Sequence, residues 1–367
     1  MQADVLVVGG GPAGLATAIA ARLQNLRVTL TDFGKPPIDK PCGEGLLPEA
    51  VSALSRLGIE LDSNLGFPLA GFRFSDQESS VNATIPKRRA FGLRRTLLQQ
   101  LLIDRASELG VSFLWGAKIS GLCVDGARVN DDFLPCKWIV GADGQHSSVR
   151  RLAGLGARQY RDSRFGFRRH YAIAPWSDLV EVHWGRKLQM VVTPTSAREI
   201  CVSLFSSDSR VRLGRAFEQF PEVAARLGGA EPVSEEAGAV TSFGRAARVA
   251  RGNVALVGDA GCAVDAVAGQ GLSLAFRQSL ALAKALARED LAFYESEHSE
   301  IIRTPVRMTK LLRLMNANST LRRKVLRFFA ARPERFAEMI SVHTGRSSGD
   351  VLNSARIVDL GWRVLWA

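Results

Sequence analysis

Three glycines near the N-terminus have the spacing of a phosphate-binding turn. They are Gly9, Gly11 and Gly14. A short apolar run at residues 5–8 precedes them, and an alanine-rich stretch at 15–23 follows. In a strand–turn–helix unit the first glycine permits the tight turn, the second lets a pyrophosphate approach the backbone, and the third lets the helix pack on the strand. The spacing therefore predicts a dinucleotide site at the start of a helix, with Pro12 and Ala13 inside the turn.

A carboxylate stands where a dinucleotide ribose would need an acceptor. Residues 27–31 predict a second strand, and Asp32 follows it, 18 positions after Gly14. In such a unit, an acid about 20 residues beyond the glycines binds the ribose hydroxyls. The order of strand, glycines, helix, strand and acid makes the dinucleotide prediction far more specific than the glycines alone.

Two later strands end in turns that contain an aspartate. Residues 138–144 read W-I-V-G-A-D-G and contain Asp143, and residues 254–260 read V-A-L-V-G-D-A and contain Asp259. The segment Gly269-Gln270-Gly271 then leads into an apolar stretch at 272–287 that predicts a helix. The N-terminus of that helix would stabilise a negative charge placed before it.

These three motifs, in this order, resemble the single-component FAD-dependent monooxygenases of the para-hydroxybenzoate hydroxylase type and their relatives, the geranylgeranyl reductases. The resemblance runs from Met1 to about Ala287. It implies that Asp259 contacts the ribityl and pyrophosphate region of FAD, and that Asp143 lies between FAD and a nicotinamide cofactor. Arg95, at the start of a predicted helix, matches an arginine that contacts FAD in this superfamily, and Arg94 is the alternative.

The resemblance and the glycine motif together give a set of predicted cofactor-binding residues. They are Gly9, Gly11, Pro12, Ala13, Gly14, Asp32, Cys42, Gly43, Arg95, Asp143, Gly258, Asp259, Gly269, Gln270, Gly271 and Leu272. The chain departs from the family pattern at Cys262, Ala266 and Gln278, where histidine, proline and aspartate are common. These differences leave the prediction of FAD binding intact and alter the pocket over the ring.

The segment at 40–48 reads K-P-C-G-E-G-L-L-P, and its prolines and glycines predict a loop. In the family this loop runs beside the isoalloxazine ring. Its Cys42-Gly43 pair resembles geranylgeranyl reductases, whereas its G-E-x-x-x-P pattern resembles flavin halogenases. The halogenase interpretation fails because the chain has no W-x-W pair. Cys42 is a candidate for tuning the flavin or donating a proton, and the alternative is a small loop residue without a chemical role.

Residues 72–85 and 165–205 alternate polar and apolar side chains at the period of a strand. The resemblance places an antiparallel sheet here, with substrate on its inner face. The candidates for that face are Arg169, His170, His183, Trp184, Met190 and Thr193. His170 joins Cys42 as a catalytic candidate. The sequence shows no metal-ligand pattern and needs none, because the flavin carries the chemistry.

The C-terminal region holds most of the excess positive charge. The chain has a formal net charge of +12, and residues 301–336 hold ten basic residues and one acid. Arg303, Arg307, Lys310 and Arg313 share one face of a predicted helix. Two interpretations stay open: a peripheral contact with an anionic membrane, or a solvated helical cap on the FAD domain. No base-reading motif is visible, so nucleic acid is not an expected partner.

The predicted fold is α/β, with a Rossmann-type, glutathione-reductase-like FAD-binding domain built on a parallel sheet. An antiparallel-sheet substrate domain and a C-terminal helical region complete it. The predicted boundaries are 1–70, 94–155 and 245–290 for the FAD-binding domain, 71–93 and 156–244 for the substrate domain, and 291–367 for the helical region. Five scattered cysteines and the absence of a secretory signal fit a cytoplasmic protein, with contact at the inner face of the membrane as the alternative location.

The expected function is that of an NAD(P)H-dependent monooxygenase. Only one G-x-G-x-x-G is present, so NAD(P)H is expected to dock transiently, reduce FAD and leave. A flavin C4a-hydroperoxide would then hydroxylate a small hydrophobic aromatic or polyketide-like molecule of secondary metabolism. The absence of an aromatic stretch at 189–194 argues against a geranylgeranyl-type reductase, which remains the first alternative. A flavin-binding sensor without catalysis is the second.

Overall fold

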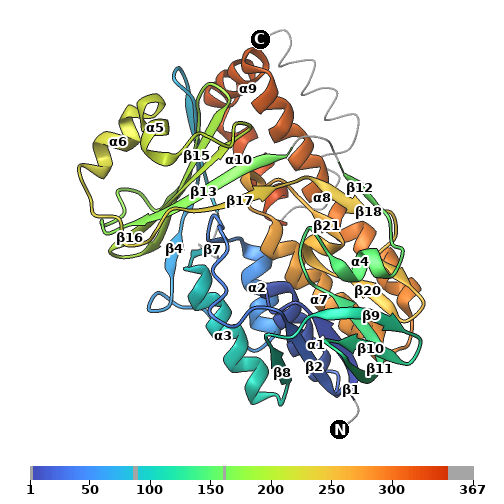
Figure 1. Cartoon of the computed structure of the whole chain (residues 1–367). Coiled ribbons are helices and arrows are strands. Elements are labelled where there is room, and N and C mark those ends of the chain that lie inside the picture. The colour runs from blue at the N-terminus through green and yellow to red at the C-terminus, as the bar shows by residue number, and fades with distance from the viewer. Residues whose placement is uncertain (1–2, 86–89, 160–162, 346–367) are drawn as a thin grey trace.

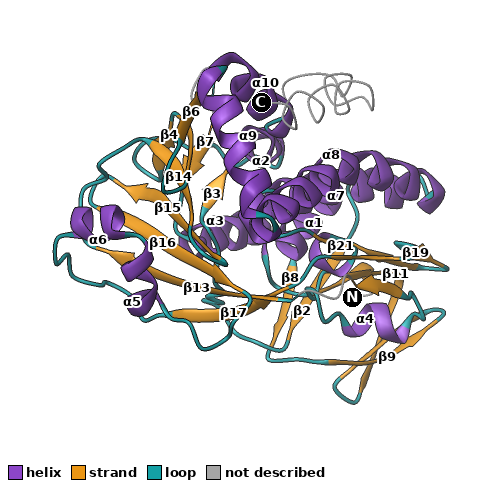
Figure 2. Cartoon of the chain, turned by 90° about the horizontal axis from the view of Figure 1, so that it is seen from above, coloured by secondary structure: helices purple, strands orange, loops and turns teal. Residues whose placement is uncertain are grey.

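The computed structural model describes residues 3–85, 90–159 and 163–345. Its N-terminal part is a parallel sheet covered by helices, and its middle part is a broad, mostly antiparallel sheet (Figure 1). Long C-terminal helices run back across both parts (Figure 2). This arrangement matches the predicted α/β architecture.

The first sheet is built around β1 (Ala3–Val8), whose last four residues are buried valines and leucine. Its strands, in spatial order, are β19 (Ala250–Arg251), β20 (Val254–Leu256), β11 (Asp132–Gly141), β1 (Ala3–Val8), β2 (Val28–Asp32) and β8 (Ser112–Trp115), with β10 (Gly126–Val129) and β9 (Ile119–Cys123) attached to β11. The pairs from β20 to β8 are parallel, and Val5 lies beside both Val28 and Trp138. Residues Val5 to Val8 are all buried, so both faces of this part of β1 are covered, which explains why it shows no alternation.

Helix α1 (Pro12–Arg22) packs against β1 and β2 and also contacts both α3 (Arg95–Glu108) and α7 (Gly271–Ala287). A Cβ on Gly14 would lie 1.7 Å from the Gly9 carbonyl oxygen, so the turn before α1 needs glycine there. Thr17 and Ser279 join α1 to α7 through hydroxyl groups 2.8 Å apart. The small residues of both helices allow this close approach.

The second sheet carries the predicted substrate face. Its strands, in spatial order, are β17 (Ala237–Thr241), β13 (Arg164–Tyr171), β16 (Glu199–Ser206), β15 (Leu188–Ser196), β14 (Leu179–Trp184), β5 (Gly71–Ser75) and β6 (Ser80–Thr84). All neighbours are antiparallel except β14 and β5. Small helices α5 (Leu213–Ala216) and α6 (Pro221–Leu227) cover its outer face, where Met190, Val202 and Val223 share one apolar cluster.

Two small sheets complete the described strands. One contains β3 (Gly45–Leu46), β7 (Ala90–Gly92) and β4 (Phe67–Leu69), and the other contains β12 (Ala157–Gln159), β18 (Gly244–Ala246) and β21 (Cys262–Ala263). Short helices α2 (Pro48–Arg56) and α4 (Ser148–Leu152) lie near them in the chain. The loop around Cys42 leads into β3, and β3 pairs with β7, the strand that precedes Arg94.

The C-terminal helices cap both the first sheet with its helices and the second sheet. α8 (Leu291–Ala317) packs on α7, while α9 (Ser319–Ala331) and α10 (Pro333–His343) contact β6. Phe74 of β5 lies 5.1 Å, ring centre to ring centre, from both Trp184 and Phe336. The remainder of the predicted helical region, 346–367, lies outside the described residues.

Several arginines of α8 and α9 form ion pairs with the turn between β5 and β6 and with the segment 261–270 before α7. Arg322 lies 3.9 Å from Asp76, Arg323 and Arg327 both contact Glu78, and Arg313 contacts Asp265 at 3.2 Å. These contacts place part of the local positive charge inside the fold and favour the helical-cap interpretation. Among the described helices, none is long and apolar enough to cross a membrane.

A buried histidine of α8 predicts acid sensitivity. His298 is 4% exposed, and burial lowers its pKa to about 4. The unfolded chain therefore binds a proton at higher pH than the folded chain does. The contribution of His298 to the free energy of unfolding is therefore complete above pH 6.5. It falls by roughly 3 kcal/mol as the pH is lowered toward 4.

Replacement of His298 by leucine should flatten this part of the curve of unfolding free energy against pH, measured by urea denaturation. His343, which is also buried with a pKa of about 4, keeps its own share of the slope. The matched control is His146→Asn, because His146 is exposed. An unchanged slope in His298→Leu would contradict the assignment.

Candidate active site

The first glycine turn is held in shape by Asp32 and by a glutamine of α3. Asp32 accepts N–H bonds from Gly10 at 2.6 Å and Gly34 at 2.7 Å, one at each carboxylate oxygen. Gln99 donates to the Gly10 carbonyl at 2.9 Å and accepts from the Ile38 N–H at 2.7 Å. Asp32 thus shapes the turn and keeps further lone pairs for a ribose, and Gln99 ties the turn to the loop before Cys42.

The predicted glycines fall into two groups by the space beside them. A Cβ on Gly9 or Gly14 would collide with backbone, so these two positions serve close packing. A Cβ on Gly43, Gly269 or Gly271 would meet no atom within 4 Å, and one on Gly11 would meet only Arg95, at 3.9 Å. The open group borders a cradle in which exposed backbone faces free space, as a flavin dinucleotide requires.

Arg95 joins three of the predicted motifs. Its guanidinium lies beside Gly11, and its positive charge acts on both Cys42 and Asp259, lowering their pKa against the rise caused by desolvation. The Nε atom of Arg95 is buried and has no hydrogen-bond acceptor. An unpartnered guanidinium N–H in a cradle of open glycines fits an anionic dinucleotide.

The other predicted cofactor residues surround the same region or support it. Asp259 is accessible to solvent, yet the surrounding protein raises its pKa. Asp143 accepts the Ser148 and Val149 N–H groups at the start of α4, and its second oxygen has no partner. Pro12 begins α1, and Ala13 and Leu272 pack at the edge of the core, while a Cβ on Gly258 would meet Ala13 at 2.8 Å.

Two glutamines explain part of the departure from the family pattern. Gln278 accepts the Gly258 N–H at 2.7 Å, so it supports the turn that carries Asp259. Gln270 donates to the carbonyl of His343, at the end of α10. The segment 261–270, which we call the flavin-side loop, is therefore anchored by the C-terminal helices, and this contact could not be predicted from sequence.

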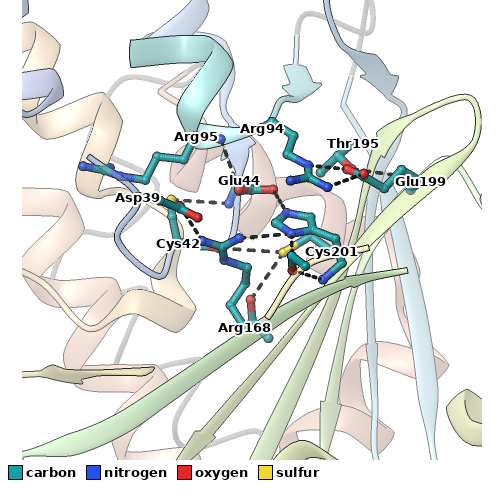
Figure 3. Close-up of polar contacts among 12 residues, drawn as sticks. Asp39, Cys42, Glu44, Arg94, Arg95, Arg168, Thr195, Glu199 and Cys201 are labelled. Carbon is teal, nitrogen blue, oxygen red and sulfur yellow. Dashed lines mark hydrogen bonds and ion pairs between the residues drawn. The ribbon is translucent and has the colours of Figure 1, made fainter. Parts of the chain in front are cut away.

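The loop around Cys42 docks on the inner face of the substrate sheet through a buried acid–base pair (Figure 3). Glu44 Oε2 lies 2.6 Å from His170 Nε2, and both side chains are almost completely buried. The backbone N–H of Arg95 donates to Glu44 Oε1 at 3.1 Å. Glu44 adopts φ +58°, a left-handed conformation that is costly for a non-glycine residue and is often found at functional sites.

Further contacts extend this seam. Arg168, two residues before His170 on β13, donates to His170 Nδ1 at 3.0 Å and to Asp39 at 2.5 Å. Cys201 Sγ lies 3.8 Å from the carbonyl oxygen of Cys42. We call Asp39, Cys42, Glu44, Arg168, His170 and Cys201 the loop–sheet seam. Of these, only Cys42 and His170 were predicted from sequence.

Burial raises the pKa of both thiols in the seam, that of Cys201 well above its ordinary value. Cys42 and Cys201 are therefore protonated thiols near neutral pH. The Cys42 sulfur also accepts the Glu44 N–H at 3.4 Å. Cys42 thus lies beside the Glu44–His170 pair and beside the open side of Gly43, which is where a catalytic or tuning role would place it.

Glu44, His170 and Cys201 bring three ligand-type atoms within 4.8 Å of one another. Their hydrogen bonds argue against a metal centre. The guanidinium of Arg168 lies against the ring of His170, and a second cation there would be repelled. We interpret the group as part of the hydrogen-bonded seam.

The structure corrects three of the six candidates for the substrate face. His170 and Thr193 lie on the inner face, in register with Cys201. Trp184 shares that face but packs against Phe74 under α10. Arg169, His183 and Met190 point to the opposite face instead: Met190 joins the cluster under α5 and α6, His183 is its cross-strand partner, and Arg169 is paired with Val202 of that cluster.

On that outer face, His183 belongs to a row of hydrogen-bonded polar side chains that is separate from the loop–sheet seam. Its Nδ1 lies 2.8 Å from Ser75 Oγ and its Nε2 lies 3.1 Å from Glu181. All three residues are buried beneath the sheet, away from the cradle. We assign these three hydrogen-bonded side chains a structural role.

Arg94 and Arg95 have different roles. Arg94 forms two hydrogen bonds with Glu199, which also accepts from Thr195 at 2.8 Å. That contact raises the pKa of Arg94 and lowers that of Glu199, despite the opposing effect of burial on each. Arg94 is therefore committed to the sheet, and Arg95 is the arginine at the cradle.

The fold, the cradle and the seam together define an FAD-binding protein. The chain belongs to the FAD binding domain family, whose model matches residues 2–291. Several curated proteins that match part of the chain carry the names of enzymes, which favours catalysis over a sensor without catalysis.

Two curated proteins and one solved structure illustrate what the chain is similar to. The chain is 32% identical over 177 residues to the menaquinone reductase of Mycolicibacterium smegmatis, covering 45% of this chain and 42% of that protein. It is 29% identical over 162 residues to the rifampicin monooxygenase of Streptomyces venezuelae, covering 41% of this chain and 34% of that protein. The chain thus matches less than half the length of these curated relatives. A flavoprotein/dehydrogenase from Cytophaga hutchinsonii has the same fold, with a TM-score of 0.86, 17% identity, and coverage of 100% of this chain and 99% of that chain.

Replacement of Gly11 by valine should abolish most FAD binding while the protein stays folded. The new side chain would enter the cradle, where only Arg95 lies near, and the backbone of Gly11 is in a conformation that valine accepts. We expect at least a tenfold loss of FAD affinity, about 1.4 kcal/mol, measured by flavin fluorescence on reconstituting the apoprotein.

The matched control is Gly214→Val, at another position with open space around its Cβ, outside the cradle. The thermal midpoints of both apoproteins should stay close to that of the wild type. Equal FAD affinity in Gly11→Val and wild type would show that the cofactor lies elsewhere.

Proposed function

We propose that the protein is an NAD(P)H-dependent monooxygenase that hydroxylates a small, hydrophobic, phenol-like aromatic or polyketide-like molecule. The observation that carries the proposal is the Glu44–His170 pair on the inner face of the substrate sheet. Bound FAD supplies electron transfer from NAD(P)H and activation of oxygen. The chain itself must bind the ring, exclude water and manage a proton.

Glu44 is suited to accept that proton. One carboxylate oxygen accepts the Arg95 N–H, and the other lies at hydrogen-bond distance from His170 Nε2. A carboxylate held in this way acts as a base toward a substrate hydroxyl. Removing the hydroxyl proton makes an aromatic ring more electron-rich, which hydroxylation requires, and positioned general bases contribute roughly 10²–10⁴-fold to rates.

The second candidate is a reductase acting on an unsaturated lipid or prenyl substrate. Cys42 and Cys201 favour it, because buried thiols that stay protonated are suited to proton donation rather than acceptance. The similarity to a menaquinone reductase over part of the chain points the same way. The two candidates therefore assign the decisive proton to different residues of the seam.

Peripheral contact of residues 301–336 with an anionic membrane also remains a proposal. The exposed Leu314, 53% accessible, lies on α8 within that segment. The ion pairs of Arg322, Arg323 and Arg327 with the sheet reduce the charge left for such a contact.

Glu44→Gln should lower hydroxylation at least 100-fold, because the amide keeps the shape of Glu44 and loses its basicity. The measurement is incorporation of ¹⁸O from ¹⁸O₂ into a panel of phenols, by mass spectrometry, with FAD-loaded protein and NADH or NADPH. Cys42→Ser should change the rate less than tenfold. Glu78→Gln, on the far side of the sheet edge, controls for loss of a carboxylate.

The reductase is supported instead if no phenol gains oxygen and a prenylated quinone loses a double bond. In that case Cys42→Ser should be the damaging substitution. That pattern would overturn the monooxygenase proposal.

A further inference from the structure

We propose that Arg168 is a positioning residue that fixes the ring proton of His170 on Nε2, where it faces Glu44. The assignment of the tautomer rests on hydrogen-bond geometry alone. Its catalytic meaning, that Glu44 is kept as a base, rests on the proposed function.

The argument starts from the polarity of the hydrogen bonds. A guanidinium has only donors and stays protonated in proteins. Its Nη1 lies 3.0 Å from His170 Nδ1, so Nδ1 must accept and cannot carry a proton in this geometry. The proton of a neutral ring is then on Nε2, 2.6 Å from the carboxylate of Glu44. In this series of hydrogen bonds, from Arg168 through His170 to Glu44, each atom is either a donor or an acceptor, without conflict.

The remaining groups around His170 leave the assignment to Arg168. Ser234 Oγ lies 3.1 Å from Nδ1, accepts the backbone N–H of His170 at 3.0 Å and donates to the Glu235 carbonyl at 3.2 Å, so this hydroxyl does not decide the tautomer. The charged and titratable groups that face the ring are Arg168, Glu44, Cys201 and, further along the sheet, Glu199. None of them offers an acceptor for a proton on Nδ1.

Arg168 is itself held from the other side. Its side chain is 2% exposed, whereas its partner Asp39 is 43% exposed and belongs to the loop. Because an arginine cannot relay a proton, the contact with Asp39 orients the guanidinium and transfers no proton. This is the arrangement in which a third group orients the acid–base residue of a catalytic pair.

The loop and the tautomer are thereby linked. Asp39 binds Arg168 and Glu44 binds His170, and both of these partners lie on β13. Between the two acids, the Cys42 carbonyl contacts Cys201 on the neighbouring strand β16. His170 and Cys201 are cross-strand partners. A loop that leaves the sheet would release Arg168 and His170 together, so the base is assembled only when the loop is docked.

The test is nitrogen NMR of the FAD-loaded protein labelled with ¹⁵N-histidine, with the His170 resonances assigned by comparison with His170→Asn. In wild type at pH 7, Nε2 should be protonated and Nδ1 unprotonated. In Arg168→Met, which removes the donor and keeps the length of the side chain, the ratio of the two tautomers should shift by roughly tenfold or more. Arg168→Lys, which restores a charged donor, should recover part of the wild-type ratio.

Arg169→Met is the matched control, because Arg169 is the next residue on β13 and points to the opposite face. Flavin content and circular dichroism identify variants that fail to fold. If Arg168→Met does not fold, Asp39→Asn removes the carboxylate that orients Arg168 and should shift the ratio of His170 tautomers in the same direction by a smaller factor.

A wild-type His170 protonated on Nδ1, or an unchanged tautomer ratio in a folded Arg168→Met, would overturn the proposal. These readouts do not depend on turnover. A failure of the monooxygenase assignment would therefore leave the tautomer result standing, and the reverse also holds.

Discussion

The contact between Glu44 and His170 is the interaction on which the site depends. A buried carboxylate is costly unless it is fully hydrogen-bonded, and Glu44 has the Arg95 N–H and the ring of His170 as partners. These partners come from the start of α3 and from β13, so the charge can be satisfied only when the loop, the helix and the sheet meet. The left-handed backbone at Glu44 is tolerated because the neighbouring contacts fix it. One electrostatic requirement thus joins the cofactor side of the protein to the substrate side.

The cradle is maintained by similar cross-connections. Gln99 links the glycine turn to the loop before Cys42, and Gln278 supports the turn that carries Asp259. The C-terminal helices brace the flavin-side loop through Arg313–Asp265 and through Gln270 and the carbonyl of His343. The helices that carry most of the excess positive charge therefore stabilise the cofactor loop as well as cover the sheet.

Much of the cofactor half could be predicted from sequence, because its determinants are local. A glycine turn between a buried strand and an alanine-rich helix needs no distant partner, and β1, α1 and β2 lie where the pattern predicts. The substrate half was less predictable. Strand alternation identifies two faces but does not say which one meets the flavin, so His170 was placed correctly while His183 and Met190 were not. Glu44 was missed because its partner is 126 residues away, and only its position between two glycines hinted at a special backbone.

The most direct test of this account is a double-mutant cycle on Glu44 and His170. The unfolding free energies of Glu44→Leu, His170→Leu and the double variant would be measured by urea denaturation of the FAD-loaded protein. If the buried contact holds loop and sheet together, the two substitutions should couple by about 1–3 kcal/mol, with the double variant less destabilised than the sum of the single ones. Additive effects, within about 0.5 kcal/mol, would show that the two side chains do not depend on each other and would contradict the account.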